Sequence, residues 1–557
     1  MKFGDLRFAG AALLTALLFF EPVVLRAGTP DGGAKKALTE SQRARHILSR
    51  LTFGGRAADF EKIRRIGVKA YVDEQLNPET IDDSALDKRL ARLPTLTLST
   101  PLLAAQYNPP KPKPTPSPAP TPSPSPSPTP ADTPKPAPTP TPKPPPPPKN
   151  PQMVVNELQR AKLLRAVYSE RQLDEVLVDF WENHFSIYAG KDADRWLLTS
   201  FDRDAIRPYA FGRFRDLLGA VAHSPAMLFY LDNWQSRAER VYPATKDKPE
   251  RKTGGINENY ARELMELHTL GVDGGYTQRD VQEVARCLTG WTIRKPNEEG
   301  LFMFDPQMHD NGEKIVLGQK IPAGGGIADG EKVLDILAKH PSTAKFIATK
   351  LARRFLGDDP PAAVVNQAAQ VFLKTDGSIR ETLRSIVTSA AFLSPAVYQA
   401  KIRSPFEFAA AALRITDAET DGGNPVLGGI AKMGQPLFGH LTPEGFTEKS
   451  RDWLAPGALL ERLNFAVALA ANQLKGTTID ARKLLGDADF ARPAEVSEKL
   501  AALILRNELS PASKAEFDKI AGGAAGAAND PTNRNRPPLY VTELLALALG
   551  APEFQRR

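Results

Sequence analysis

The sequence predicts a mainly α-helical protein: one large multi-helix domain with a small β-hairpin and a long proline-rich disordered insertion. The chain has 557 residues, 41% of them hydrophobic and 25% charged, a composition typical of a globular protein with a large core. On both sides of residue 151, apolar residues recur three and four positions apart between capping residues, the pattern of amphipathic helices. Patterns typical of strands are confined to residues 302–317, where Asn311-Gly312 suggests the tight turn of a small β-hairpin or of a longer loop.

Residues 1–27 are predicted to be a secretory signal peptide. Lys2 and Arg7 give a basic start, and residues 8–20 form an uncharged, mostly apolar run of 13 residues, which is short for a bilayer span. Cleavage after Ala27 fits this pattern. No later stretch is long and apolar enough to cross a membrane. We therefore expect an exported protein, periplasmic or extracellular, with no transmembrane span in the mature chain.

Residues 34–108 are predicted to be the N-terminal helices of the main domain. Thr39 and Gln42 form a capping-box pattern that opens a helix ending at Leu51. Further helices are expected at 57–66, 68–76 and 83–93, where Gly67 and the Asn-Pro pair at 77–78 separate them.

Residues 109–151 are low in complexity and hold 23 of the 50 prolines. Such a segment cannot build a core, so we expect an extended, polyproline-like, disordered spacer. It serves either as a solvated insertion or as a segment that binds a wall polymer or carries O-linked sugars. The spacer also carries much of the net charge of +7, which leaves the folded part only weakly basic. We therefore expect no nucleic acid as a partner.

Residues 152–400 are predicted to form the central helical core, and residues 401–557 the C-terminal helical part of the same domain. A long helical region at 156–188 has an apolar stripe that includes His184. Later helices are expected at 207–222, 277–290, 330–338 and 341–356, and then at 362–373, 378–390, 405–414, 455–473, 493–505, 512–520 and 538–549. The loop 434–452, with His440 and Phe446, is a candidate cover for a pocket.

Residues 257–271 are predicted to form one helix, with Asn257 as its N-cap and Gly271 as its stop. At about 100° per residue, Glu258, Arg262 and Glu263 lie on one side and His268 lies on the apolar side. Two interpretations stay open. Either the charges form a solvated face over a core histidine, or they belong to a buried polar site.

The second interpretation predicts that His184 and His268 meet in one buried site with Glu258, Arg262 or Glu263. A buried histidine needs a partner for each ring nitrogen, and this helix offers carboxylates within one or two turns. These five residues are the catalytic candidates, and the helix that carries Arg286 is a candidate to complete the site.

Metal and thiol chemistry have weaker support in the sequence. His184 and His268 are weak metal-ligand candidates, because imidazole with a carboxylate is an ordinary zinc or iron ligand set. The zincin motif HExxH and paired CxxC are both missing, and no cofactor is identified. Cys287, the only cysteine, lies in an apolar helix pattern typical of a buried inert thiol.

Several motifs together resemble the bacterial domain of unknown function 1800 family. They are RHILSRLTFG at 45–54, FWENHF at 180–185, NENYARELMELHTLG at 257–271, GYTQRDV at 275–281, LTGWT at 288–292, HDNG at 309–312, HPSTAKF at 340–346 and PEFQR at 552–556. The resemblance runs from about residue 39 to the end, interrupted by the spacer, and departs from the family at Glu182 and Phe446. It implies a large, exported, mostly helical protein. It implies no established activity, so it assigns no catalytic role.

Two functions of different classes follow. The first is a cell-envelope binding or assembly protein whose partner is an envelope protein or polymer; it rests on export, the spacer and the missing catalytic signature. The alternative is a metal-assisted hydrolase or an oxidoreductase with its site between helices 173–188 and 256–271. The sequence gives no oligomeric state.

Overall fold

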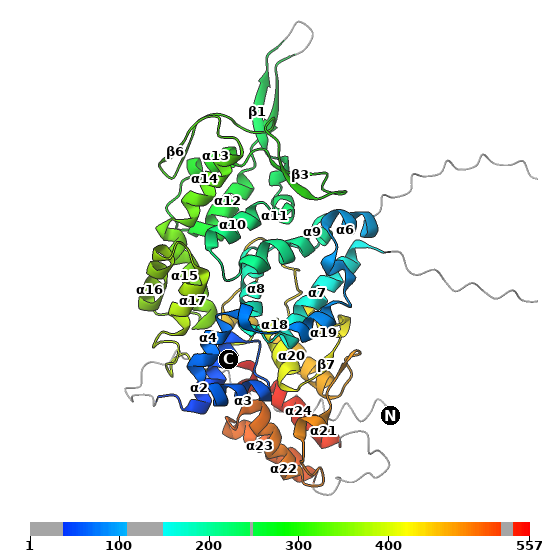
Figure 1. Cartoon of the computed structure of the whole chain (residues 1–557). Helices are drawn as coiled ribbons and strands as arrows, with labels where there is room; N and C mark the ends of the chain where they lie inside the picture. The colour runs from blue at the N-terminus through cyan, green and yellow to red at the C-terminus, as the bar shows by residue number, and fades with distance from the viewer. Residues whose placement is uncertain (1–36, 109–148, 245–248, 525–537) are drawn as a thin grey trace, which may run out of the picture.

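The computed structural model describes residues 37–108, 149–244, 249–524 and 538–557 (Figure 1). Helices dominate these ranges, and the strands there form only two-stranded pairs, so the predicted fold class is confirmed. No helix within the described ranges is long and apolar enough to cross a membrane. The helices before the spacer are α2 (Glu40–Leu51), α3 (Ala57–Ile66), α4 (Val68–Gln75), α5 (Ser84–Leu90) and α6 (Thr100–Tyr107).

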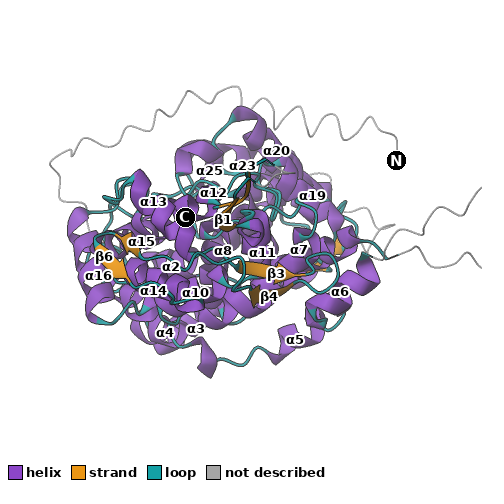
Figure 2. Ribbon diagram, turned by 90° about the horizontal axis from the view of Figure 1, so that it is seen from above, coloured by secondary structure: helices purple, strands orange, loops and turns teal. Residues whose placement is uncertain are grey.

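The central helices include α8, which lies near the middle of the molecule in both views (Figures 1 and 2). They are α7 (Pro151–Tyr168), α8 (Gln172–His184), α9 (Asp194–Ser200), α10 (Phe214–Ala222), α11 (Pro225–Tyr230), α12 (Glu258–Met265), α13 (Gln278–Cys287), α14 (Ile327–Ala338), α15 (Pro341–Phe355), α16 (Ala362–Lys374) and α17 (Ile379–Val387). The C-terminal helices are α18 (Pro405–Ile415), α19 (Asn424–Lys432), α20 (Pro456–Ala470), α21 (Ala481–Leu485), α22 (Pro493–Leu500), α23 (Pro511–Gly523), α24 (Leu539–Gly550) and α25 (Pro552–Gln555).

Capping chemistry sets the predicted helix starts. The backbone N–H of Gln42 donates to the Thr39 hydroxyl at 3.2 Å, which confirms the capping box of α2. Asn150 caps α7 in the same way, so the last residues assigned to the spacer belong to a helix start instead. The rest of the predicted spacer, and the predicted signal peptide, lie outside the described residues.

The helical region predicted at 156–188 consists of two helices, because the chain is extended at Ser169. The Ser169 hydroxyl donates to Asp83 at 2.7 Å, which ties the break to the N-terminal helices. The Gln172 side chain then donates to the free carbonyls of Ala166 and Ser169 at 3.1 and 2.9 Å. The Gln172 side chain thus bonds carbonyls at the end of α7, and the break leaves few backbone groups without a hydrogen-bond partner.

The described residues contain three hairpins, whereas the sequence predicted one, within residues 302–317. They are β1 (Arg237–Tyr242) with β2 (Arg251–Gly255), β3 (Trp291–Arg294) with β4 (Leu301–Phe304), and β5 (Lys314–Val316) with β6 (Gln319–Ile321). The tight turn expected at Asn311-Gly312 lies instead at Leu317-Gly318, where both φ angles are positive, as a two-residue type I′ turn requires. A fourth pair, β7 (Glu419–Thr420) with β8 (Thr477–Thr478), is a short bridge between loops.

The two ends of the described chain meet. The N-terminal helices α2–α4 lie beside the C-terminal helices (Figure 1), and Arg45 pairs with Glu508 at 2.5 Å. Arg557 is buried, and its backbone exchanges two hydrogen bonds with Lys401, of 2.8 and 3.1 Å. Apolar residues from Ala44 to Phe554 form one hydrophobic cluster. The last residues of the chain are therefore part of the core.

Candidate functional site

The predicted helix at 257–271 has a kink near its end. Asn257 caps α12, its side chain accepting from the backbone N–H of Tyr260 at 3.0 Å, and Gly271 ends the helix with a φ of 81°. Between them, α12 gives way at Glu266 to a π-helical turn, η6 (Glu266–Leu270). A π turn adds a residue to the helical repeat and so rotates the side chains that follow. His268 stays buried on η6.

The structure brings His184 and His268 together. Their ring centroids lie 6.2 Å apart, and the Nε2 atom of His184 is 3.1 Å from the backbone oxygen of His268. Both rings are buried, and Phe185 packs edge-on against His268 at 5.0 Å. Burial lowers the pKa of His268 to about 3. Burial, with the nearby Lys350 ammonium, also holds the pKa of His184 well below its usual value. Both rings are therefore neutral at physiological pH.

The charged candidates on α12 have their polar partners on α13. Glu258 accepts hydrogen bonds from Gln278 at 2.6 Å and from Gln282 at 3.2 Å. Arg262 donates to Gln278 at 2.8 Å and lies 3.9 Å from Glu258. Glu263 is partly exposed, and burial with the neighbouring Glu266 raises its pKa. None of these contacts involves the two histidines.

The helix that carries Arg286 was the candidate to complete the site, and Arg286 itself has partners away from the two histidines. It pairs with Glu283 on its own helix at 2.9 Å and with Asp310 at 2.8 Å.

Lys350 on α15, which was not among the predicted site residues, is the polar partner of His184. Its Nζ atom is 2.8 Å from the Nδ1 atom of His184. An ammonium group can only donate, so Nδ1 is the acceptor, and Nε2 carries the proton that is donated to the His268 carbonyl. Burial is the largest cause that lowers the pKa of Lys350, to about 8.

This arrangement does not fit a metal ion on His184. One ring nitrogen faces an ammonium group and the other faces a carbonyl, so neither is free to bind a cation. Within the described ranges, no group of three or more His, Cys, Asp or Glu side chains is arranged to hold a metal.

Lys350 and His184 line an outer cavity of about 660 Å³ between α8, α15 and the loop 434–453. Its size is in the range of cavities that take small-molecule ligands. The lining combines aromatic rings with charged groups: Phe180, Phe446, Trp453, His440, Arg353, Lys449, Glu444 and Glu448. The prediction that this loop covers a pocket agrees with its place in the lining.

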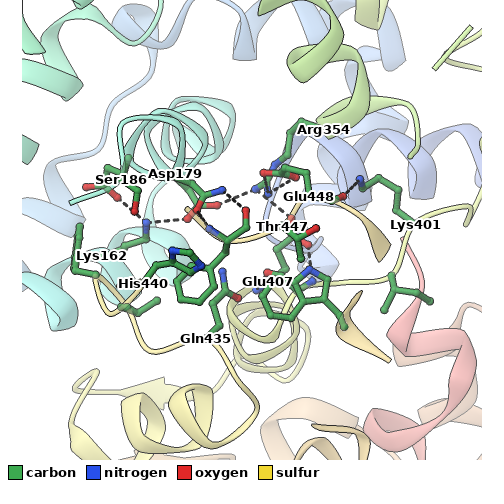
Figure 3. Close-up of a pocket in the computed structure, with 18 of the residues that line it drawn as sticks. Lys162, Asp179, Ser186, Arg354, Lys401, Glu407, Gln435, His440, Thr447 and Glu448 are labelled. Atoms are coloured by element: carbon green, nitrogen blue, oxygen red, sulfur yellow. Dashed lines mark hydrogen bonds and ion pairs between the residues drawn. The ribbon is translucent and has the colours of Figure 1, made fainter. Parts of the chain in front are cut away.

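An inner cavity of about 50 Å³ lies next to the outer one and shares part of the loop with it. Buried ion pairs line it, and Figure 3 shows Lys162 and Arg354 on either side of Asp179. Lys162 contacts Asp179 at 2.8 Å, and Arg354 contacts it at 2.9 Å. Glu407 links Arg354, at 3.1 Å, to Arg557, at 2.8 Å.

The charges of the inner cavity shift one another's pKa values. Burial raises the pKa of Glu407, but the guanidinium groups of Arg557 and Arg354 outweigh it and hold the pKa at about 2. At Glu182, burial dominates and raises the pKa to about 8, although Lys162 donates to it at 2.6 Å. Paired buried charges of this kind fix a unique arrangement of helices more than they add stability.

Sequence patterns alone did not reveal Lys350, Arg354 and Glu407 as members of this site. Glu407 is the third residue after Ser404 and completes a capping box, which is sufficient reason for a glutamate there. The remaining signal was its place in the first turn of α18, a helix whose only other charged residue is Arg414 in the last turn. Lys350 and Arg354 are four residues apart, so they lie on one face of α15, and that face turns toward α8.

The fold and the site define a large helical protein with a polar cavity at its centre. A family model described as "Protein of unknown function (DUF1800)" matches residues 46–556, nearly the whole chain, so the chain belongs to this family. Searches of curated proteins and of solved structures found no match.

Proposed function

We propose that the chain is an exported protein that binds a component of the cell envelope in the outer cavity. The observation that carries the proposal is this cavity of about 660 Å³, which places aromatic rings and charged groups together at a loop-covered opening. The basic and apolar pattern of residues 1–27 supports export. The proline-rich composition of residues 109–151 supports contact with an envelope polymer, one of the roles that the sequence leaves open for this segment.

The geometry favours binding over the metal-assisted alternative. His184 and His268 were the candidate ligands, and the ring nitrogens of His184 are used by Lys350 and by a backbone carbonyl. Binding needs only the cavity and its lining. It requires no activated water and no redox group.

The test is binding of the mature chain, residues 28–557, to an isolated envelope fraction. We expect saturable binding that falls at least tenfold in Phe446→Ala, because this ring lines the cavity and packs against His440 at 4.7 Å. Lys514→Ala is the matched control, since Lys514 is exposed on α23 and pairs only with Asp518. Equal binding by wild type and Phe446→Ala, or no binding by wild type, would overturn the proposal.

A further inference from the structure

Lys350 is a partly buried cation without a carboxylate partner in the part of the chain that the structure describes. Its one polar contact is the Nδ1 atom of His184 at 2.8 Å. Glu448 also lines the outer cavity, but it is engaged by Arg354 at 3.4 Å. Lysines removed from water are normally paired, so an unpaired one beside a cavity marks a place for a negative charge.

Two further cations around the outer cavity lack a carboxylate among the described residues. Arg353 follows Lys350 on α15 after one turn, and its Nε donates to the backbone oxygen of Asp358 at 3.1 Å. Lys449 is exposed on the loop. Of the two glutamates in the lining, Glu444 takes part in no ion pair and accepts from Thr442 at 2.7 Å. Unpaired positive charge therefore exceeds unpaired negative charge around this cavity.

The geometry points to an oxyanion-bearing ligand: we infer that Lys350 and Arg353 hold a carboxylate, phosphate or sulfate group of a molecule whose body lies against Phe446 and Trp453. This inference rests on the proposed function and names the chemical class of its ligand. The oxyanion supplies the ion-pair partner that Lys350 lacks among the described residues, where the charge of Glu448 acts on it without a direct contact.

His184 acts as a positioning residue for this ammonium group. Its Nε2–H donates to the backbone oxygen of His268, which fixes the ring and presents Nδ1 to Lys350. One of the three N–H groups of Lys350 is used in this contact, and the other two stay available for a ligand. The neutral His184 ring therefore fixes the position of the Lys350 ammonium group and leaves its positive charge uncompensated.

The pH dependence of binding follows from the groups that face Lys350. They are His184 on α8, His268 on η6, Arg353 on α15, and His440, Glu444, Glu448 and Lys449 on the loop. Both buried histidines stay neutral, and Lys350, with a pKa of about 8, changes charge just above neutral pH. A bound oxyanion favours the protonated amine, so affinity falls as the pH rises through 8, and binding near pH 8 takes up protons.

The experiment is calorimetric titration of the mature chain with three probes: tetragalacturonate, which carries carboxylates, maltotetraose, a neutral tetrasaccharide with the same α-1,4 linkage, and tripolyphosphate. We expect at least one anionic probe to bind at least tenfold more tightly than maltotetraose. Lys350→Met should lose at least tenfold in affinity for that probe, while Lys350→Arg should keep binding within about threefold and lose the pH dependence near 8. Lys345→Met, an exposed lysine on the same helix, is the control.

Equal affinity for charged and neutral probes, or full binding by Lys350→Met, would overturn the inference. If Lys350→Met does not fold, the same decision rests on Lys350→Arg: a pH dependence equal to that of wild type would contradict the role of Lys350. The proposed function and this inference are tested independently of each other. Envelope binding that depends on Phe446 but not on Lys350 would keep the proposed function and end this inference.

Discussion

At the scale of single residues, the polar centre depends on charges that hold one another in place. Glu407 is buried and contacts both Arg354 and Arg557. Breaking such a pair leaves an uncompensated buried charge, which costs more than the pair itself contributes. Glu407 and Glu182 both line the inner cavity, but their pKa values differ. Two guanidinium groups hold the pKa of Glu407 at about 2, whereas burial raises the pKa of Glu182 to about 8.

Glu407→Gln should lower the free energy of unfolding by about 3 kcal/mol at pH 7. The folded pKa of about 2 is below the unfolded value of about 4.5, so this contribution is complete above pH 4.5 and is lost as the pH falls toward 2. Urea unfolding of the wild-type and Glu407→Gln proteins at a series of pH values from 7 toward 2 measures this difference in the free energy of unfolding. Glu444→Gln, on the exposed part of the loop, is the control. A difference that stays constant down to pH 2 would contradict the assignment.

At the scale of elements, capping residues and glycines could be read from the sequence, and irregular turns could not. The N-caps Thr39, Asn257 and Thr277 stand where predicted because each is decided by two or three adjacent residues. The π turn after Met265 and the break at Ser169 depend on packing against distant helices, which no local pattern records. The short helices α19 and α21 were missed for the same reason.

Two glycines with positive φ give a matched prediction. Gly271, with φ of 81° and ψ of 163°, lies in a region almost exclusive to glycine, and Gly318 has φ of 75°, so alanine is strained at both by about 1 kcal/mol or more, and more so at Gly271. A Cβ atom at Gly271 would lie 2.9 Å from the Phe346 ring, whereas a Cβ atom at Gly318 would meet nothing within 4 Å. Gly271→Ala should therefore lower the free energy of unfolding by about 1–3 kcal/mol more than Gly318→Ala. Equal losses in chemical denaturation would show that Phe346 moves aside freely.

At the scale of the whole molecule, segments distant in the sequence build the site. The residues around the two cavities come from α7, α8, α15, α18, the loop 434–453 and Arg557. Sequence reasoning predicted the helical class and linked His184 with His268, because each histidine lies on an apolar stripe. It did not predict Lys350 as their partner, because a lysine on an amphipathic helix is normally solvated and its neighbour on α8 is 166 residues away.

Replacing residues 109–148 with a flexible linker of about six residues should leave the melting temperature almost unchanged. The two ends of this segment are close, since the Lys149 ammonium donates to Gln106 at 2.8 Å and lies over the Tyr107 ring. Loop length affects stability by only about 0.6 kcal/mol per doubling. Calorimetry of the two proteins checks this, and a fall of many degrees would show that the segment packs on the body.

The central claim is that Lys350 is an unpaired cation in a ligand cavity. Competitive acetylation of the mature protein, read by mass spectrometry at each lysine across pH 6–11, measures it most directly. We predict half-maximal reactivity of Lys350 near pH 8 and protection by the envelope fraction, while Lys345, exposed on the same helix, shows no protection. Half-maximal reactivity of Lys350 well above pH 8, or equal reactivity in the presence of the envelope fraction, would contradict the claim.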